Sequence, residues 1–192
     1  MQNDVAMKEF VVKFLKDNLP LFYFYHNEQH TLYVLKKAVE IAEHEKCTSQ
    51  EIRLIKAAAL WHDTGITEAY VGHEEISCRL AAKNLPDFGF SIDDINTIKG
   101  MIMATKIPQS PHNKLEEIIA DADLEYLGTE RASEISSLLF RELQYLDGSL
   151  TKDEWINKQI PFLRNHHYFT KYLKGNQEHE KNRYLKFLTD HV

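Results

Sequence analysis

The chain has 192 residues, 43% of them hydrophobic and 27% charged, so it can bury one good core and does not resemble a disordered sequence. Its formal net charge of -6 and its lack of a basic stripe argue against a nucleic-acid partner, because such binding requires clustered Lys and Arg side chains.

The segment of residues 1–19 carries acids and lysines throughout and has no long apolar run, which argues against a signal peptide or a membrane partner. Cys47 and Cys78 are the two cysteines, and they form no CxxC pair. This usage predicts free thiols in a reducing compartment, and hence a cytoplasmic protein.

Apolar residues recur at helical spacing from the start of the chain, and no segment alternates as a strand would. The first three helical periods comprise Phe10, Val11, Phe14 and Leu15, then Leu32, Leu35, Val39 and Ala42, then Ile52, Ile55, Ala59 and Leu60. The pattern predicts an all-α fold.

Helix starts and stops divide this pattern into units. Capping boxes are expected where Thr48 precedes Glu51, Ser91 precedes Asp94 and Thr151 precedes Glu154. Breaks are expected at Gly65, 86–89, 108–111, Gly128 and Gly148. We therefore expect about eight or nine helices with short linkers and, because neither a repeat nor a composition break occurs, a single domain over residues 1–192.

Three segments carry residues suited to chemistry. In chain order they are Tyr25-His26-Asn27-Glu28-Gln29-His30, Trp61-His62-Asp63-Thr64-Gly65 and Ala120-Asp121-Ala122-Asp123-Leu124. The second one ends the apolar run 57–61, which must be a buried helix. A buried carboxylate costs several kcal/mol unless it has a partner, and a metal ion satisfies a carboxylate and an imidazole together.

A histidine from the first segment, the His62-Asp63 pair and an acid from the third make a mixed nitrogen and oxygen donor set. Such a set suits Mn²⁺, Fe²⁺, Mg²⁺, Ni²⁺ or Zn²⁺ and leaves positions free for water. Asp121 and Asp123 lie about 200° apart around a helix, so both cannot easily bind the same ion.

The three segments, in this order and spacing, resemble the HD superfamily of metal-dependent phosphohydrolases over about residues 22–128. The resemblance implies a phosphodiesterase-like helical bundle, with accessory helices over about 129–192. It also implies His30, His62 and Asp63 as metal ligands, with Asp123 as the fourth ligand and Asp121 as the alternative.

The first segment is similar to the motif of cyclic-nucleotide phosphodiesterases, which implies that His26 is a general acid beside the ligand His30. The patterns Tyr70-Val71-Gly72-His73-Glu74-Glu75-Ile76-Ser77 and 121–128 resemble small stand-alone bacterial HD proteins. His73 and Glu74 are therefore candidates to support the first metal or to bind a second one.

The resemblance implies an enzyme that cleaves a phosphoric ester or anhydride of a nucleotide or related small phosphorylated metabolite by metal-activated water. Asp63 would hold metal and water, and His26 would protonate the leaving oxygen. One alternative is a non-catalytic, ligand-sensing HD module. Another is an HD-type di-iron oxygenase, which is disfavoured because residues 102–105 lack a further histidine. The sequence leaves the substrate and the oligomeric state open.

Overall fold

The computed structural model describes residues 2–190, and all regular secondary structure in that range is helical. The α-helices are α1 (Gln2–Asn18), α2 (Glu28–His44), α3 (Ser49–Trp61), α4 (His73–Asn84), α5 (Ile92–Ala104), α6 (Lys114–Asp123), α7 (Ala132–Leu146), α8 (Lys152–Asn165), α9 (Lys171–Asn176) and α10 (Glu178–Asp190). Three 3-10 helices are η1 (Thr64–Thr67), η2 (Leu85–Phe88) and η3 (Glu125–Gly128). The expected all-α fold is confirmed.

Helix N-termini follow the expected chemistry. Thr48, Ser91 and Thr151 each form a complete capping box at the start of α3, α5 and α8. Asn27 and Asn113 cap α2 and α6 by accepting hydrogen bonds from backbone N–H groups of the first turn. These caps set where α2 and α6 begin, which matters because both helices carry candidate metal ligands.

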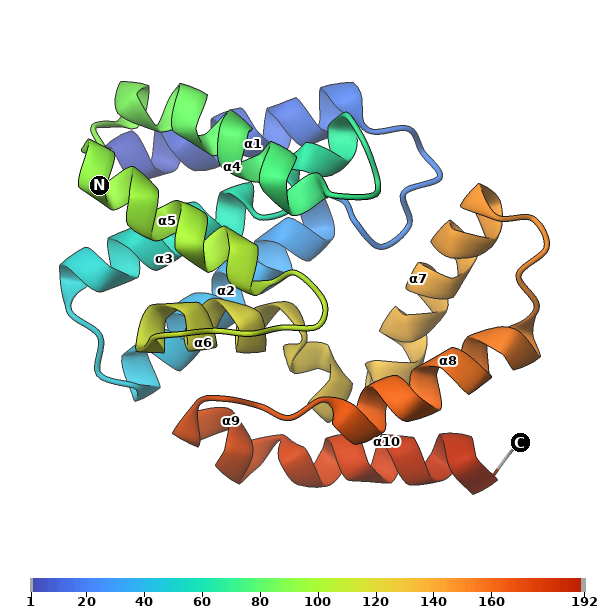
Figure 1. The fold of residues 1–192 in the computed structure, drawn as a ribbon. Helices are drawn as coiled ribbons and strands as arrows, with labels where there is room; N and C mark the ends of the chain where they lie inside the picture. Colours follow the sequence, from blue (N-terminus) through green and yellow to red (C-terminus); the bar gives the residue numbers. More distant parts are fainter. Residues whose placement is uncertain (1, 191–192) are drawn as a thin grey trace.

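Helices α1 to α6 form one bundle, and α7 to α10 lie along a second side of it (Figure 1). The bundle encloses the main core, in which Trp61, Ile55, Ile98 and Met101 are fully buried. A smaller apolar cluster joins η3 to α7, α8 and α10. The accessory helices are therefore packed onto the end of α6, close to the third sequence motif.

Helices α7 and α8 diverge from each other in Figure 1, and a hydrogen bond from Ser136 to Gln159 connects them. Pro161 lies inside α8, so the accessory tail continues through this proline in helical form. No helix among residues 2–190 is long and apolar enough to cross a bilayer.

Candidate metal centre

Three helix ends bring the candidate ligands together. His30 lies in the first turn of α2, directly after the Asn27 cap. His62 follows the last residue of α3 and Asp63 precedes η1, so the helix break turns both side chains toward α2. Asp123 is the last residue of α6.

The donor atoms of these residues converge; we call His30, His62, Asp63 and Asp123 the four-donor cluster. His30 Nε2 lies 3.0 Å from Asp123 Oδ1, 3.4 Å from Asp63 Oδ2 and 3.4 Å from His62 Nε2. His62 Nε2 lies 3.0 Å from Asp63 Oδ2 and 3.7 Å from Asp123 Oδ1. Donors bound to one ion at about 2.0–2.2 Å sit roughly 3.0–3.6 Å apart, so four of these distances fit a coordination sphere and the distance of 3.7 Å lies just outside it.

Hydrogen-bond directions support the same conclusion. His62 Nδ1 donates a hydrogen bond to Ala59 O at 2.9 Å. Its other ring nitrogen, Nε2, therefore faces the cluster and is available to bind a metal. Asp63 Oδ2 is buried and has no hydrogen bond among the described residues, although it faces two imidazole nitrogens. A divalent cation would satisfy this oxygen and both nitrogens at once.

The electrostatics of the cluster also favour a cation. Burial alone would lower the pKa of His62, but the Asp63 and Asp123 carboxylates outweigh it and raise that pKa well above its ordinary value. Burial likewise opposes ionisation of Asp123, yet His30 and His62 lower its pKa to about 2. The carboxylates therefore stay ionised, and a bound metal would displace a proton from His62.

Asp121 lies outside the cluster. Its carboxylate accepts from Phe169 N and Thr170 N, each at 2.8 Å, and from the Thr170 hydroxyl at 2.6 Å. Burial raises the pKa of Asp121 to about 6, against these hydrogen bonds, which lower it. The structure therefore gives Asp121 a role in holding the start of α9, and places Asp123 with the histidines.

His26 lies beside the cluster, with its ring centroid 6.1 Å from that of His30. Its Nδ1 donates to Glu142, a fully buried carboxylate of α7. Glu142 also accepts from Tyr25 N at 2.9 Å and from His26 N at 3.0 Å. Three donors on one carboxylate fix the ring, and they leave Nε2 as the nitrogen available to a ligand.

His73 and Glu74 begin α4, after the left-handed Gly72. His73 Nδ1 donates to Tyr70 O at 2.8 Å, and His73 Nε2 lies 3.5 Å from Asp63 Oδ1 and 3.7 Å from Glu74 Oε1. Burial lowers the pKa of His73, but Asp63 outweighs it and raises that pKa to about 9. Both residues border the centre on the side of Asp63 Oδ1, the carboxylate oxygen that faces away from His30 and His62.

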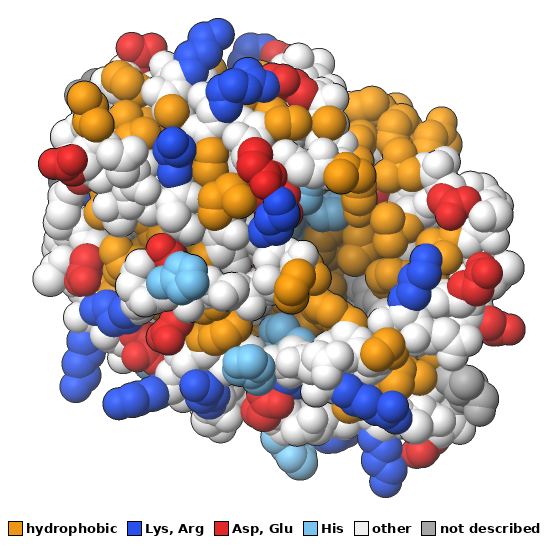
Figure 2. Space-filling model, in the orientation of Figure 1, with side chains coloured by type: hydrophobic (Ala, Val, Ile, Leu, Met, Phe, Trp, Pro, Cys, Tyr) orange, Lys and Arg blue, Asp and Glu red, His pale blue; other side chains and the backbone are white. Residues whose placement is uncertain are grey.

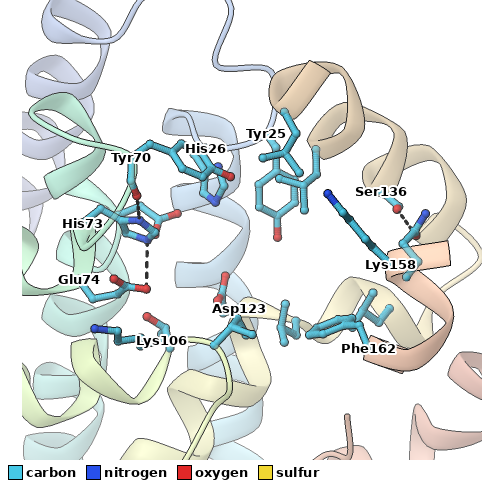
Figure 3. Close-up of a pocket in the computed structure, with 18 of the residues that line it drawn as sticks. Tyr25, His26, Tyr70, His73, Glu74, Lys106, Asp123, Ser136, Lys158 and Phe162 are labelled. Atoms are coloured by element: carbon cyan, nitrogen blue, oxygen red, sulfur yellow. Dashed lines mark hydrogen bonds and ion pairs between the residues drawn. The ribbon is translucent and has the colours of Figure 1, made fainter. Parts of the chain in front are cut away.

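A cavity of about 500 Å³ opens in front of these groups. Figure 2 shows the hollow between the α1–α6 bundle and α7–α8, with hydrophobic side chains over much of its wall. In Figure 3, His26, His73, Glu74 and Asp123 line one side and Lys158 and Phe162 the opposite side. One wall is therefore ionisable and the other mainly apolar, a combination typical of ligand pockets.

Sequence analysis did not identify Glu142 or the pocket-facing residues of α8. A signal for Glu142 was present, because it falls seven residues after Ile135 on the apolar face of α7. An acid at such a position is buried and needs donors. Its donors come from a segment 116 residues earlier, which periodicity cannot indicate.

A family model described as HD domain matches residues 27–187. No curated protein sequence matches the chain. Two solved structures share its fold. A predicted HD superfamily hydrolase from an uncultured Thermotogales bacterium has a TM-score of 0.62 and 21% identity, covering 96% of this chain and 88% of that chain. Bacillus subtilis YpgQ in complex with ADP has a TM-score of 0.66 and 17% identity, covering 100% of this chain and 95% of that chain.

Proposed function

The chain belongs to the HD domain family, and we propose that it is a metal-dependent phosphohydrolase acting on a nucleotide or a related small phosphorylated metabolite. The observation that carries the proposal is the convergence of His30, His62 and Asp123, with Asp63 against both histidines, at the wall of an open cavity. His26 lies beside this cluster and is held by a buried carboxylate. A metal site without a role in catalysis has no need for such an oriented imidazole.

The donor set and the spacing of the cluster fit a divalent ion, which would be held by His30, His62, Asp63 and Asp123. When bound, such an ion supplies Lewis acidity toward water and offsets charge on phosphoryl oxygens. Two of these ligands are fixed by the chain itself, because Ala59 O orients His62 and the Asn27 cap places His30.

His26 would act on the leaving group. Its Nδ1 proton is held by Glu142, so a proton passes between the ring and a ligand at Nε2. An imidazolium in this position can donate its Nε2 proton to a departing alkoxide, which is a much poorer leaving group without a proton. Among the described residues, Glu142 accepts hydrogen bonds from Tyr25 and His26 and does not line the cavity, so it would be a positioning residue rather than a reagent.

Two observations support a nucleotide as the substrate. YpgQ, which shares the fold over nearly its whole length, was solved with ADP. The cavity also has the size of a small-molecule site and combines ionisable and apolar walls, as a ligand with a phosphate and a base requires.

The test is a hydrolysis screen of purified protein loaded with each of Mn²⁺, Fe²⁺, Mg²⁺, Ni²⁺ and Zn²⁺. The substrates are nucleoside mono-, di- and triphosphates, cyclic nucleotides and sugar phosphates, and the Asp63→Ala variant is the matched control. We expect phosphate release that requires both metal and Asp63. Stoichiometric metal without turnover of any substrate would instead indicate a ligand-sensing module. Two coupled irons per chain would indicate an oxygenase.

A further inference from the structure

The cavity wall opposite the four-donor cluster is formed largely by one face of α8. Trp155, Lys158 and Phe162 are spaced by three and four residues, so they lie on the same side of the helix, and all three line the cavity. We call these three residues the α8 face. Phe162 also packs against the smaller apolar cluster and Trp155 stacks on Phe140, but both side chains stay partly exposed where they border the cavity.

The surroundings of the α8 face are aliphatic. Leu139 and Leu143 of α7 and Leu127 of η3 also line this cavity. The amide of Gln159 lies nearby, but its oxygen already accepts from Ser136 and Tyr184. A ligand group bound here would therefore be mainly apolar, and two of the side chains that it meets would be aromatic.

Lys158 is the polar exception on this face. It is exposed and makes no hydrogen bond or ion pair within the described residues. Figure 3 shows its side chain extending into the cavity from the wall opposite His73 and Asp123. Its charge acts on the carboxylates of Asp147 and Glu154, but it forms an ion pair with neither of them. Such an ammonium group favours a ligand that carries a hydrogen-bond acceptor, because an alkyl chain would displace its water and offer no acceptor in return.

We propose that the α8 face is the nucleobase subsite of this cavity, an inference that rests on the phosphohydrolase function proposed above. The base packs against the rings of Trp155 and Phe162, and Lys158 donates a hydrogen bond to an acceptor atom at the edge of the base. A planar heterocycle combines an apolar face with polar edge atoms, which matches this wall, while the phosphate lies at the opposite, ionisable wall.

Trp155 provides a binding readout that does not depend on turnover. The chain has one other tryptophan, Trp61, which lies in the core with 1% of its surface exposed. Titration with ADP should therefore change the fluorescence of Trp155, and the change should be lost in Trp155→Phe. Ribose 5-phosphate, which has no base, should leave the fluorescence unchanged.

Affinity measured by calorimetry completes the test. Because a base stacked on an aromatic ring loses affinity strongly when the ring is removed, Trp155→Ala and Phe162→Ala should each weaken ADP binding about tenfold or more. Trp155→Phe should retain ADP affinity. Lys158→Met should weaken ADP binding about three- to tenfold. Lys152 is an exposed lysine at the start of α8 that lies outside the cavity, so Lys152→Met should leave ADP affinity unchanged.

If the alanine variants lost as much affinity for ribose 5-phosphate as for ADP, the nucleobase subsite would be overturned. Tighter binding of decyl phosphate than of ADP would also overturn it. The proposed function fails separately. If ADP binds through the α8 face but no nucleotide is hydrolysed with any metal, the subsite stands and the phosphohydrolase proposal falls.

Discussion

Three histidines around the centre share one arrangement at the residue scale. The Nδ1 atoms of His26, His62 and His73 each donate to a protein acceptor, namely Glu142, Ala59 O and Tyr70 O. Each Nε2 is therefore directed toward the cluster or the cavity. Because the hydrogen bond at one ring nitrogen of a histidine fixes its tautomer, one defined atom of each ring is left free for a ligand or for proton transfer.

Substitution of Asp123 should remove metal binding, whereas substitution of Asp121 should lower stability. Asp123→Asn should abolish stoichiometric metal binding, as should His62→Ala, because either change leaves the other donors buried and incompletely satisfied. Asp121→Asn should keep its metal but lose about 1–3 kcal/mol of stability, since an amide cannot accept from all three donors at residues 169 and 170. Metal analysis and urea unfolding check both, and metal loss in the Asp121 variant alone would reverse the assignment.

His26→Ala should leave metal content intact while it lowers kcat about 10²- to 10⁴-fold for a substrate with an alkoxide leaving group. With p-nitrophenyl phosphate, whose phenolate leaves without a proton, the same substitution should lower kcat much less. Equal losses on the two substrates would show that His26 positions the phosphate or supports the fold.

Glu142→Gln should reproduce part of the His26 pattern without a change in metal content. The carboxylate accepts from His26 Nδ1 and from two backbone N–H groups, which the single amide oxygen of glutamine cannot do, so the ring loses its fixed orientation. Glu134→Gln, an exposed acid on the same helix, is the control and should leave kcat unchanged. A loss of kcat that is the same for alkoxide and phenolate leaving groups would contradict the positioning role.

At the scale of elements, the centre depends on the close approach of η1 to α4, which carry Gly65 and His73. A Cβ at Gly65 would lie 2.0 Å from His73 O and 2.7 Å from Ser77 N. Gly65 N also donates to Ser77 Oγ at 2.8 Å. The glycine that ends the second motif is therefore required by packing, and it holds Asp63 near His73.

Gly65→Ala should accordingly cost about 2 kcal/mol or more of stability and weaken metal binding, because η1 must move away from α4. Gly175→Ala is the matched control, since a Cβ in α9 has no heavy atom within 4 Å and alanine favours helix. Urea unfolding and metal titration measure both effects. Unchanged metal affinity in the Gly65 variant would show that the η1–α4 contact does not position the ligands.

The junction of α8 and α10 should make stability depend on pH through His166. Burial, together with Lys181 at 3.3 Å, lowers the pKa of His166 to about 3. Between that value and the ordinary histidine pKa near 6.5, the unfolded chain binds a proton that the folded chain does not. This group therefore reduces stability as the pH falls below about 6.5, by up to about 1.4 kcal/mol per pH unit.

His166→Asn should remove that contribution. Urea unfolding at pH 7 and pH 5 should show a smaller difference in unfolding free energy for the variant than for the parent chain. The same difference in both proteins would mean that His166 protonates freely in the folded state.

At the scale of the whole molecule, the four-donor cluster joins α2, the end of α3 and the end of α6. The accessory helices complete the cavity with the α8 face and with Leu139 and Leu143 of α7, and α7 also supplies Glu142, which holds His26. The α1–α6 bundle and the accessory helices therefore share one candidate site, and ligand binding should stabilise the molecule as a unit.

Metal removal tests this coupling. A divalent ion at about 100 times its Kd should add about 2.7 kcal/mol of stability, which corresponds to a Tm rise of about 5–10 °C for a domain of this size. EDTA should reverse the rise, and Asp63→Ala should show none. The absence of any shift in the parent chain with all five candidate metals would argue against a preformed metal centre.

The sequence by itself determined the features that act within one or two helical turns. The apolar period predicted the all-α fold, and the capping boxes at Thr48, Ser91 and Thr151 predicted three helix starts that the structure confirms. The HD family was also evident from three local motifs, and a family model matches residues 27–187. These signals are local because capping and helical burial involve neighbours three or four residues apart.

Only the tertiary structure decided how distant helices face each other. It placed Asp123 with the histidines and turned Asp121 toward Thr170, and it brought Glu142 to His26 across 116 residues of sequence. It also left the α8 face lining a cavity, although Phe162 packs against the smaller apolar cluster as well. The apolar period of a helix shows which side is apolar but not what that side meets, because the rotation and angle of each helix follow from packing of the whole chain.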